Sequence, residues 1–91
     1  MKTKEALDIT DESWTVYPES SGLDAAFLSN ESSRGIALWY YLSDVEPTES
    51  DGHSLRESDW IAFDTSDGSS VWLKSKNKLR DGEVAKARIS A

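Results

Sequence analysis

Three short apolar runs, separated by turn residues, constrain the fold of this chain most strongly. They fall between Gly35 and Ser75, at positions 36–42, 60–63 and 70–75. Each is rich in β-branched and aromatic residues and is shorter than the roughly ten residues that a helix usually needs. Proline, glycine and aspartate residues lie between the runs and favour turns. The pattern therefore predicts an antiparallel β-meander at the centre of an all-β fold.

Three further runs of the same character flank the meander, at positions 14–17, 23–29 and 83–90. In the last of them Ala85, Ala87 and Ile89 alternate with basic residues, which predicts one inward and one outward face. Candidate strands at regular spacing, with turn signals between them, favour a small antiparallel β-sandwich or barrel of about six strands.

Residues 1–13 carry many charges and few apolar side chains. Such a segment does not define a buried face, so we expect an N-terminal arm or a short helix there. The remaining residues, 14–91, are too few for two separate cores, and they predict a single β-sandwich domain.

An Asp-Gly pair lies between the second and third apolar runs of the meander, at Asp67-Gly68. Asp-Gly is compatible with the type I′ turn of two-residue hairpins, in which both central residues adopt a positive φ. We therefore expect residues 59–64 and 70–75 to pair as a hairpin closed around this turn.

The formal net charge of the chain is −7, from 10 basic and 17 acidic side chains. This balance argues against sequence-independent binding to nucleic acid or to an anionic membrane, because both need positive charge. No apolar run approaches the roughly 20 residues of a transmembrane helix, and the N-terminus lacks the apolar stretch of a signal peptide. We therefore expect synthesis in the cytoplasm of the producing cell.

The charges are unevenly distributed along the chain. Residues 1–70 hold four basic and 15 acidic side chains, a net charge of −11, whereas residues 71–91 hold six basic and two acidic ones, a net charge of +4. One interpretation is that the C-terminal strands are edge strands whose lysines block aggregation. The alternative is that this charge separation orients subunits head to tail or presents a small basic face.

The sequence contains little that could carry catalysis. It has no cysteine, one histidine (His53) and no Gly-x-Ser-x-Gly motif. Acidic residues gather in one loop, at Asp44, Glu46, Glu49 and Asp51, but they do not match the spacing of an EF-hand calcium loop. We therefore predict a protein that is not an enzyme and holds neither a cofactor nor a metal.

The large aromatic residues are the better candidates for a binding surface. If Lys74 faces solvent, strand alternation places Trp72 on the same outer side. The same reasoning directs Trp39, Tyr41 and Trp60 outward. The candidate partner-binding residues are therefore Trp39, Tyr41, Trp60 and Trp72, gathered on one outer face. The alternative is that the tryptophans form the core, because period-two patterns are ambiguous where both faces of a strand are apolar.

Several segments of the meander resemble a known class of proteins. They are Leu42-Ser-Asp-Val-Glu-Pro47, Gly52-His-Ser-Leu55, Asp59-Trp-Ile-Ala-Phe63 and Val71-Trp-Leu-Lys-Ser75. Together, over residues 36–76, they resemble small β-rich proteins encoded among the structural genes of tailed bacteriophages. The resemblance implies a virion component, such as a head decoration, head-fibre, tail or adaptor protein. It implies docking to copies of itself and to other virion proteins, and it assigns no site residues.

Two other functions are compatible with the sequence. The first is a carbohydrate-binding module that stacks surface glycans on Trp39, Trp60 or Trp72. The second is an acidic regulator that mimics nucleic acid, which the −11 charge of residues 1–70 suggests. In the structural role we expect a homo-oligomer with the aromatic residues at its contact, since burying exposed apolar surface between copies favours association.

Overall fold

The computed structural model describes residues 5–50 and 52–91, and these residues form eight β-strands and no helix. The strands are β1 (Leu7–Ile9), β2 (Thr15–Val16), β3 (Ala26–Asn30), β4 (Leu38–Ser43), β5 (His53–Leu55), β6 (Trp60–Phe63), β7 (Ser70–Ser75) and β8 (Ala85–Ser90). The prediction of an all-β fold is confirmed.

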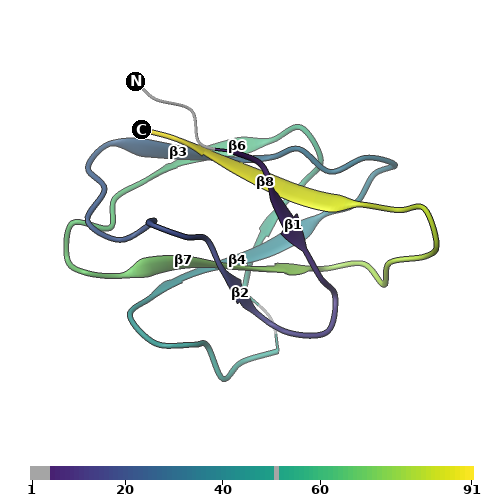
Figure 1. The fold of residues 1–91 in the computed structure, drawn as a ribbon, viewed down its shortest axis with the longest axis horizontal. Coiled ribbons are helices and arrows are strands. Elements are labelled where there is room, and N and C mark those ends of the chain that lie inside the picture. Colours follow the sequence, from purple (N-terminus) through teal and green to yellow (C-terminus); the bar gives the residue numbers. More distant parts are fainter. Residues whose placement is uncertain (1–4, 51) are drawn as a thin grey trace.

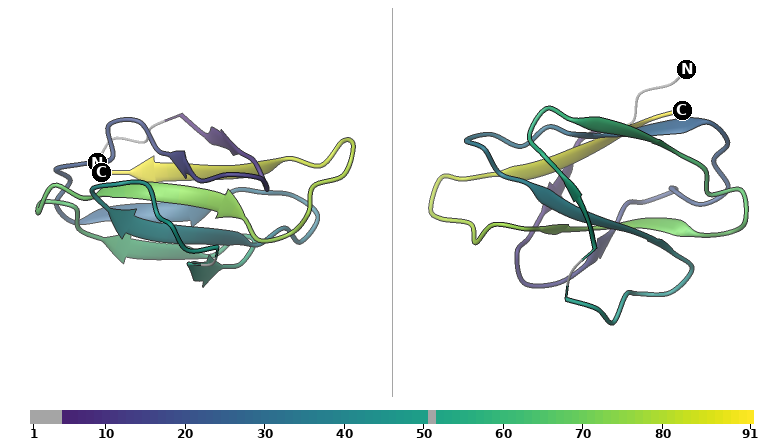
Figure 2. Two further views of the ribbon diagram at one scale, coloured as in Figure 1. Left: turned by 90° about the horizontal axis from the view of Figure 1, so that it is seen from below. Right: turned by 180° about the vertical axis from the view of Figure 1, so that it is seen from behind.

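The strands form two four-stranded sheets in which every pairing is antiparallel. Sheet A has the order β1-β8-β3-β6, and sheet B has the order β2-β7-β4-β5. Figure 1 shows sheet A above sheet B, with β1 and β2 nearest the viewer. On the side away from β1 and β2, which the right-hand view of Figure 2 brings to the front, lie β5 and β6. The arrangement is sandwich-like, with two separate sheets rather than one closed barrel.

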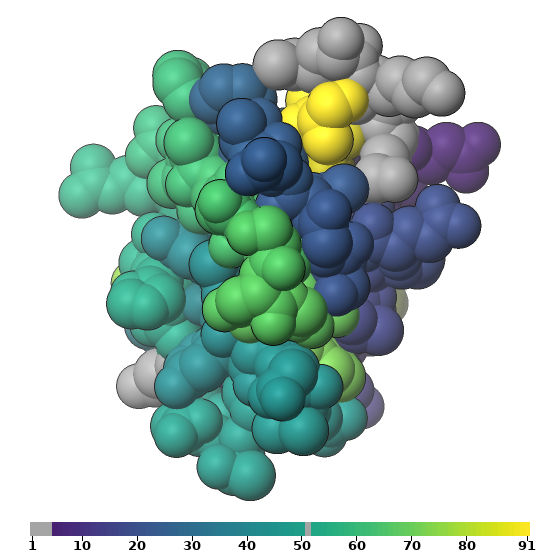
Figure 3. Space-filling model, turned by 90° about the vertical axis from the view of Figure 1, so that its left-hand side faces the viewer, coloured from purple at the N-terminus to yellow at the C-terminus, as the bar shows by residue number. Residues whose placement is uncertain are grey.

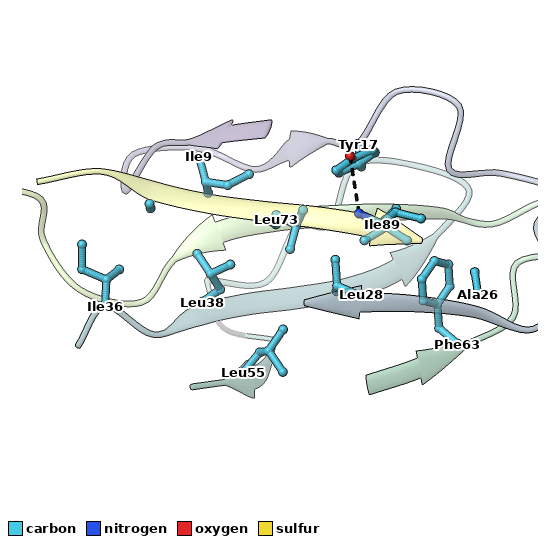
Figure 4. Packing of buried hydrophobic residues seen from close by; sticks show 13 residues of the cluster. Ile9, Tyr17, Ala26, Leu28, Ile36, Leu38, Leu55, Phe63, Leu73 and Ile89 are labelled. Carbon is cyan, nitrogen blue, oxygen red and sulfur yellow. Dashed lines mark hydrogen bonds between the residues drawn. The ribbon is translucent and has the colours of Figure 1, made fainter. Parts of the chain in front are cut away.

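The core lies between the two sheets and is built from alternate residues of their strands (Figure 4). Sheet A contributes Leu28 and Ile89, and sheet B contributes Leu38 and Leu73, all four with no exposed surface. In β8 the inward set is the predicted one, since Ala85, Ala87 and Ile89 are all buried. Alternation in the sequence therefore predicted the inward face of this strand correctly.

The structure has two more strands than the six that were predicted, β1 and β5. The N-terminal arm or short helix expected over residues 1–13 is instead a strand at Leu7–Ile9, which pairs with β8 and buries Ile9; residues 1–4 lie outside the described residues. The strand β5 falls inside a polar segment expected to be a loop, and Leu55 is its buried residue. Both strands are three residues long, too short for a periodic pattern to identify.

The predicted hairpin between residues 59–64 and 70–75 is wrong, because its two strands lie in different sheets. Strand β6 pairs with β3, whereas β7 pairs with β4 and β2. The connection from 64 to 69 instead carries the chain from sheet A to sheet B. Thr65 anchors it: the buried hydroxyl donates to the Ser20 carbonyl at 2.6 Å and accepts from the Leu23 N–H at 3.0 Å. Figure 3 shows this connection, in green, beside the blue segment that precedes β3.

Two aspartates shape the same connection. The Asp64 carboxylate accepts from the Ser66 N–H at 2.7 Å, and the Asp67 carboxylate accepts from the Ser69 N–H at 3.0 Å. Hydrogen bonds from Ser66 lower the pKa of Asp64, and those from Ser69 lower the pKa of Asp67, because each favours the charged carboxylate. The Asp67-Gly68 pair is therefore part of a connection that crosses from one sheet to the other, and not the turn of a two-residue hairpin.

The interpretation that basic residues protect edge strands is also wrong. Strands β7 and β8, which carry Lys74, Lys86 and Arg88, lie in the interior of sheets B and A. Lys86 of β8 lies 3.7 Å from the Asp8 carboxylate of β1, and Arg88 lies 3.1 Å from the Glu31 carboxylate. The edge strands β5 and β6 carry no lysine.

Candidate functional site

Three of the four predicted binding aromatics lie together on the outer face of sheet B. Tyr41 and Trp72 are direct cross-strand partners, and Trp39 lies two residues along β4. The predicted alternation in β7 is confirmed, since Val71 and Leu73 are fully buried on the inner side. All three outer aromatics are nevertheless only partly exposed.

The chain itself covers much of this outer face of sheet B. Trp14 is 8% exposed and packs edge-on against Tyr41, with ring centroids 6.1 Å apart. Its indole N–H donates to the Glu49 carbonyl at 2.9 Å, which ties the loop after β4 to the sheet. That loop runs beneath sheet B in Figure 1. The Trp72 indole N–H is bonded to the Ser43 carbonyl at 3.1 Å. These aromatics therefore form a second, smaller packed layer.

Two lysines complete this layer from outside. The Lys74 ammonium lies 5.3 Å from the centroid of the Trp14 ring, and the Lys76 ammonium lies 4.7 Å from the centroid of the Trp39 ring. Both distances are within the range of cation–π attraction. The positive charge of β7 and the residue after it is therefore engaged with the aromatic layer rather than gathered into a basic face.

Trp60 lies apart from the other three candidates, on the outer face of sheet A. The prediction that all four aromatics share one face fails for this residue, because β6 belongs to the sheet opposite β7. Its outward orientation is as predicted, with an exposed fraction of 64%. The indole stands edge-on to Phe27 of the neighbouring strand, with ring centroids 5.4 Å apart and an interplanar angle of 75°.

Around Trp60 the outer face of sheet A is a shallow aromatic surface with small neighbours. A hollow of about 370 Å³ is lined by Phe27, Ser29, Trp60 and Ser90. Arg88 lies directly across the strands from Ser29, and the Ser29 hydroxyl donates to its carbonyl at 3.3 Å. We call these outward residues of β3, β6 and β8 the outer platform: Phe27, Ser29, Trp60, Ala62, Arg88 and Ser90.

Sequence reasoning missed two aromatic residues that matter at these surfaces. Phe27 is the partner of Trp60, but its run holds small and apolar residues on both parities, so neither face stood out. The sequence predicts Trp14 within a strand, whereas it precedes β2 and packs across the outside of sheet B. The glycine at position 52 was a usable signal for this packing. A Cβ there would lie 2.6 Å from the Tyr40 carbonyl oxygen and 3.0 Å from the Trp14 ring.

A second hollow opens between the sheets on the side of β5 and β6. It measures about 310 Å³, and its lining includes Tyr40, His53, Ile61 and Phe63. The exposed His53 ring lies against Tyr40, with ring centroids 5.3 Å apart and a tilt of 36°. Within residues 5–50 and 52–91 no three His, Asp or Glu side chains cluster as metal ligands would. Asp51, one of the acidic loop residues considered for calcium, lies outside this described part.

Comparison with known proteins finds no matching protein family, no matching curated protein and no matching solved structure. In the described part of the chain no helix is long and apolar enough to span a membrane. The geometry of the two outer faces is therefore the basis for assigning a role.

Proposed function

We propose that this chain is a non-enzymatic structural protein of a tailed-phage virion, which docks to copies of itself and to other virion proteins through the outer platform. One observation carries the proposal: Trp60 lies within a regular strand, yet its exposed fraction is 64%. A large aromatic side chain held in the open by a rigid element is typical of protein contact surfaces. The virion setting comes from the resemblance of residues 36–76.

The surroundings of Trp60 support contact rather than chemistry. The platform is shallow, and the small side chains of Ser29, Ser90 and Ala62 around Trp60 permit close approach. The charged residue of the platform, Arg88, is already paired, since its Nε lies 3.1 Å from a carboxylate oxygen of Glu31. In contrast, the other aromatic face is packed against the chain's own loop. A partner would therefore bury more exposed aromatic surface at the outer platform than on the outer face of sheet B.

Self-association of the purified chain tests the proposal. We expect sedimentation velocity to show reversible association in the micromolar to millimolar range, and Trp60→Glu to abolish it while leaving the circular dichroism spectrum unchanged. Val45→Glu is a matched control, because Val45 has the same exposed fraction of 64% but lies in a loop, away from the platform. A wild type that stays monomeric, or association equally sensitive to both substitutions, contradicts the proposal.

A carbohydrate-binding role is a second candidate, and one observation favours it. The same hollow combines the rings of Phe27 and Trp60 with the hydroxyls of Ser29 and Ser90. Sugar rings stack on aromatic faces and bond to hydroxyl groups. Titration of the protein with a panel of oligosaccharides, followed by tryptophan fluorescence, separates the two roles. A saturable change that Trp60→Ala removes supports sugar binding, and its absence across the panel argues against it.

A further inference from the structure

Strand β6 is an unprotected edge of sheet A. It ends the order β1-β8-β3-β6, and among the described strands it pairs with β3 alone. Natural edge strands usually carry lysine, proline, an inward charge or a bulge, which prevent further pairing. The four residues Trp60–Phe63 include no charged residue and no proline, and their register with β3 is continuous from Trp60 to Phe63.

The backbone register shows which groups of β6 face the open edge. The Asn30 N–H donates to the Asp59 carbonyl at 3.0 Å, so Asp59 directs its carbonyl toward β3. Backbone groups alternate sides along an antiparallel strand. Ile61 and Phe63 therefore bond to β3, whereas Trp60 and Ala62 direct their N–H and C=O groups away from it. Both of these residues are exposed.

We propose that β6 pairs antiparallel with β6 of a second copy, across a two-fold axis at Ile61, and so joins two A sheets into one. This inference rests on the self-association in the proposed function and specifies its geometry. In this register Trp60 lies opposite Ala62 of the second copy, and Ile61 lies opposite its own counterpart. The outward groups of Trp60 and Ala62 then meet their complements, and four backbone hydrogen bonds form across the axis.

The side chains fit this register and not its neighbours. A large residue faces a small one, because the Trp60 indole meets Ala62 of the second copy, which in turn lies beside Phe27. A slip of one residue would pair Trp60 with Ile61 of the second copy, whose backbone groups face β3, and would put the outer faces of the two copies on opposite sides. A slip of two would place Trp60 opposite either itself or Asp64. In the centred register Asp59 faces Phe63, and Asp64 lies beyond the partner strand, toward the turn at Ser58, so no two acidic residues oppose each other.

The inner side of the same edge also gains a partner. Ile61 is half-buried and lines the hollow between the sheets, together with Tyr40 and Phe63. The second copy would bring its own Ile61 against this opening and remove apolar surface from water, which favours association. The pairing thus provides hydrogen-bond partners for the free backbone groups of β6. It also covers part of the outer platform and the opening between the sheets.

A disulfide experiment tests this geometry directly, because the chain has no cysteine of its own. Directly opposed residues that are not hydrogen-bonded partners have Cα atoms about 4.5 Å apart, which a disulfide can span. We expect Ile61→Cys to give a covalent dimer under mild oxidation. Ala62→Cys is the control: it lies diagonal to its counterpart, at a separation beyond the roughly 7 Å limit for a disulfide. It should stay largely uncrosslinked.

A second variant examines the backbone pairing itself. Ala62→Pro removes an N–H that faces the open edge and leaves the bonds between β3 and β6 in place. We expect a folded monomer, whereas Ile61→Pro removes a bond to β3 and should unfold sheet A. If the wild type associates but Ile61→Cys gives no covalent dimer, or crosslinks no better than Ala62→Cys, the β6 pairing is overturned and the proposed docking role still stands. A wild type that never associates overturns both.

Discussion

The Trp60 indole stands edge-on to the Phe27 ring across the β3–β6 pair, with centroids 5.4 Å apart. These two side chains come from segments more than thirty positions apart and are brought together by the register that sets Ser29 opposite Trp60 and Phe27 opposite Ala62. The contact holds one face of an exposed indole in a defined orientation. A ring held this way loses little further freedom when a partner binds, which favours tight contact.

We expect Phe27→Ala to loosen Trp60 without unfolding the protein. An edge-to-face aromatic pair contributes roughly 0.5–1.5 kcal/mol beyond burial, so the loss in unfolding free energy should be modest. Self-association should weaken because the indole is no longer fixed. Urea denaturation and sedimentation measure the two effects. Val84→Ala, which trims an exposed apolar side chain away from the outer platform, is the control and should leave both nearly unchanged. A wild-type association constant in Phe27→Ala would contradict the role of this contact.

Asn30 should be among the most sensitive positions for stability. Its buried amide donates to the Ile36 carbonyl at 3.0 Å and to the Leu55 carbonyl at 2.9 Å, and it accepts from the Ser32 N–H at 2.9 Å. It therefore links sheet A to β5 and to the chain entering β4. We expect Asn30→Ala to cost about 3 kcal/mol or more of unfolding free energy, because three backbone groups lose their partner.

Asn77 provides a matched comparison for Asn30. Its side-chain oxygen accepts from the Ala37 N–H at 2.9 Å, but the site is exposed and water can replace it. Asn77→Ala should cost only about 0.5–1 kcal/mol. Equal losses for the two variants in urea denaturation would show that Asn30 is not a structural link between the sheets.

Tyr17 should make stability depend on alkaline pH. Its buried hydroxyl donates to the Glu5 carbonyl and accepts from the Ile89 N–H at 3.4 Å, and so bridges β8 and the residues just before β1 begins. Burial raises the pKa of Tyr17 above 10.0, although the backbone bond from Ile89 opposes this. The unfolded chain therefore loses this proton first, so stability is intact below pH 10.0 and falls as the pH rises from there through the folded pKa.

Tyr17→Phe separates the two contributions of this hydroxyl. Near neutral pH the variant should lose roughly 1 kcal/mol of unfolding free energy, from the missing hydrogen bonds. Above about pH 10 its stability should fall less steeply than that of the wild type. Denaturation series at several pH values measure this slope. Identical slopes for the two proteins would mean that the pKa of Tyr17 is the same in the folded and the unfolded state.

Gly52→Ala should disturb the loop that covers sheet B. The added Cβ would lie 2.6 Å from the Tyr40 carbonyl oxygen, which is backbone and cannot move easily. We expect a loss of about 1–3 kcal/mol, typical of overpacking, and a shift of the Trp14 indole N–H signal as its bond to Glu49 weakens. Ser50→Ala, in the same exposed loop, should change neither. An unshifted Trp14 signal in Gly52→Ala would contradict this packing.

Strand positions could be predicted where period-two alternation was clear. The runs at Trp60–Phe63 and Ser70–Ser75 match β6 and β7, and the inward residues of β8 were predicted correctly. Strand pairing could not be predicted in the same way. The Asp67-Gly68 pair indicated a turn, but Thr65 and Ser20, whose buried hydrogen bonds commit the chain to a crossover, are ordinary polar residues in the sequence.

The candidate site was predicted in part for the same reason. The outward direction of Trp60 and Trp72 follows from alternation within a strand, and this is a local property. Which aromatics share a face depends on the sheet to which each strand belongs, and this is set by long-range pairing. The packing of Trp14 over sheet B could not be predicted either, because it depends on a close contact with Gly52, which is 38 residues away in the sequence.

The four tryptophans offer the most direct test of docking through the outer platform. Each gives its own indole N–H signal in a nitrogen–proton correlation spectrum, and Trp60 alone reports on sheet A. On dilution from the millimolar to the micromolar range, we expect the Trp60 signal and the β6 amides to shift, while the signals of Trp14, Trp39 and Trp72 stay fixed. Unchanged spectra, or shifts confined to the three tryptophans of sheet B, would contradict docking through the outer platform.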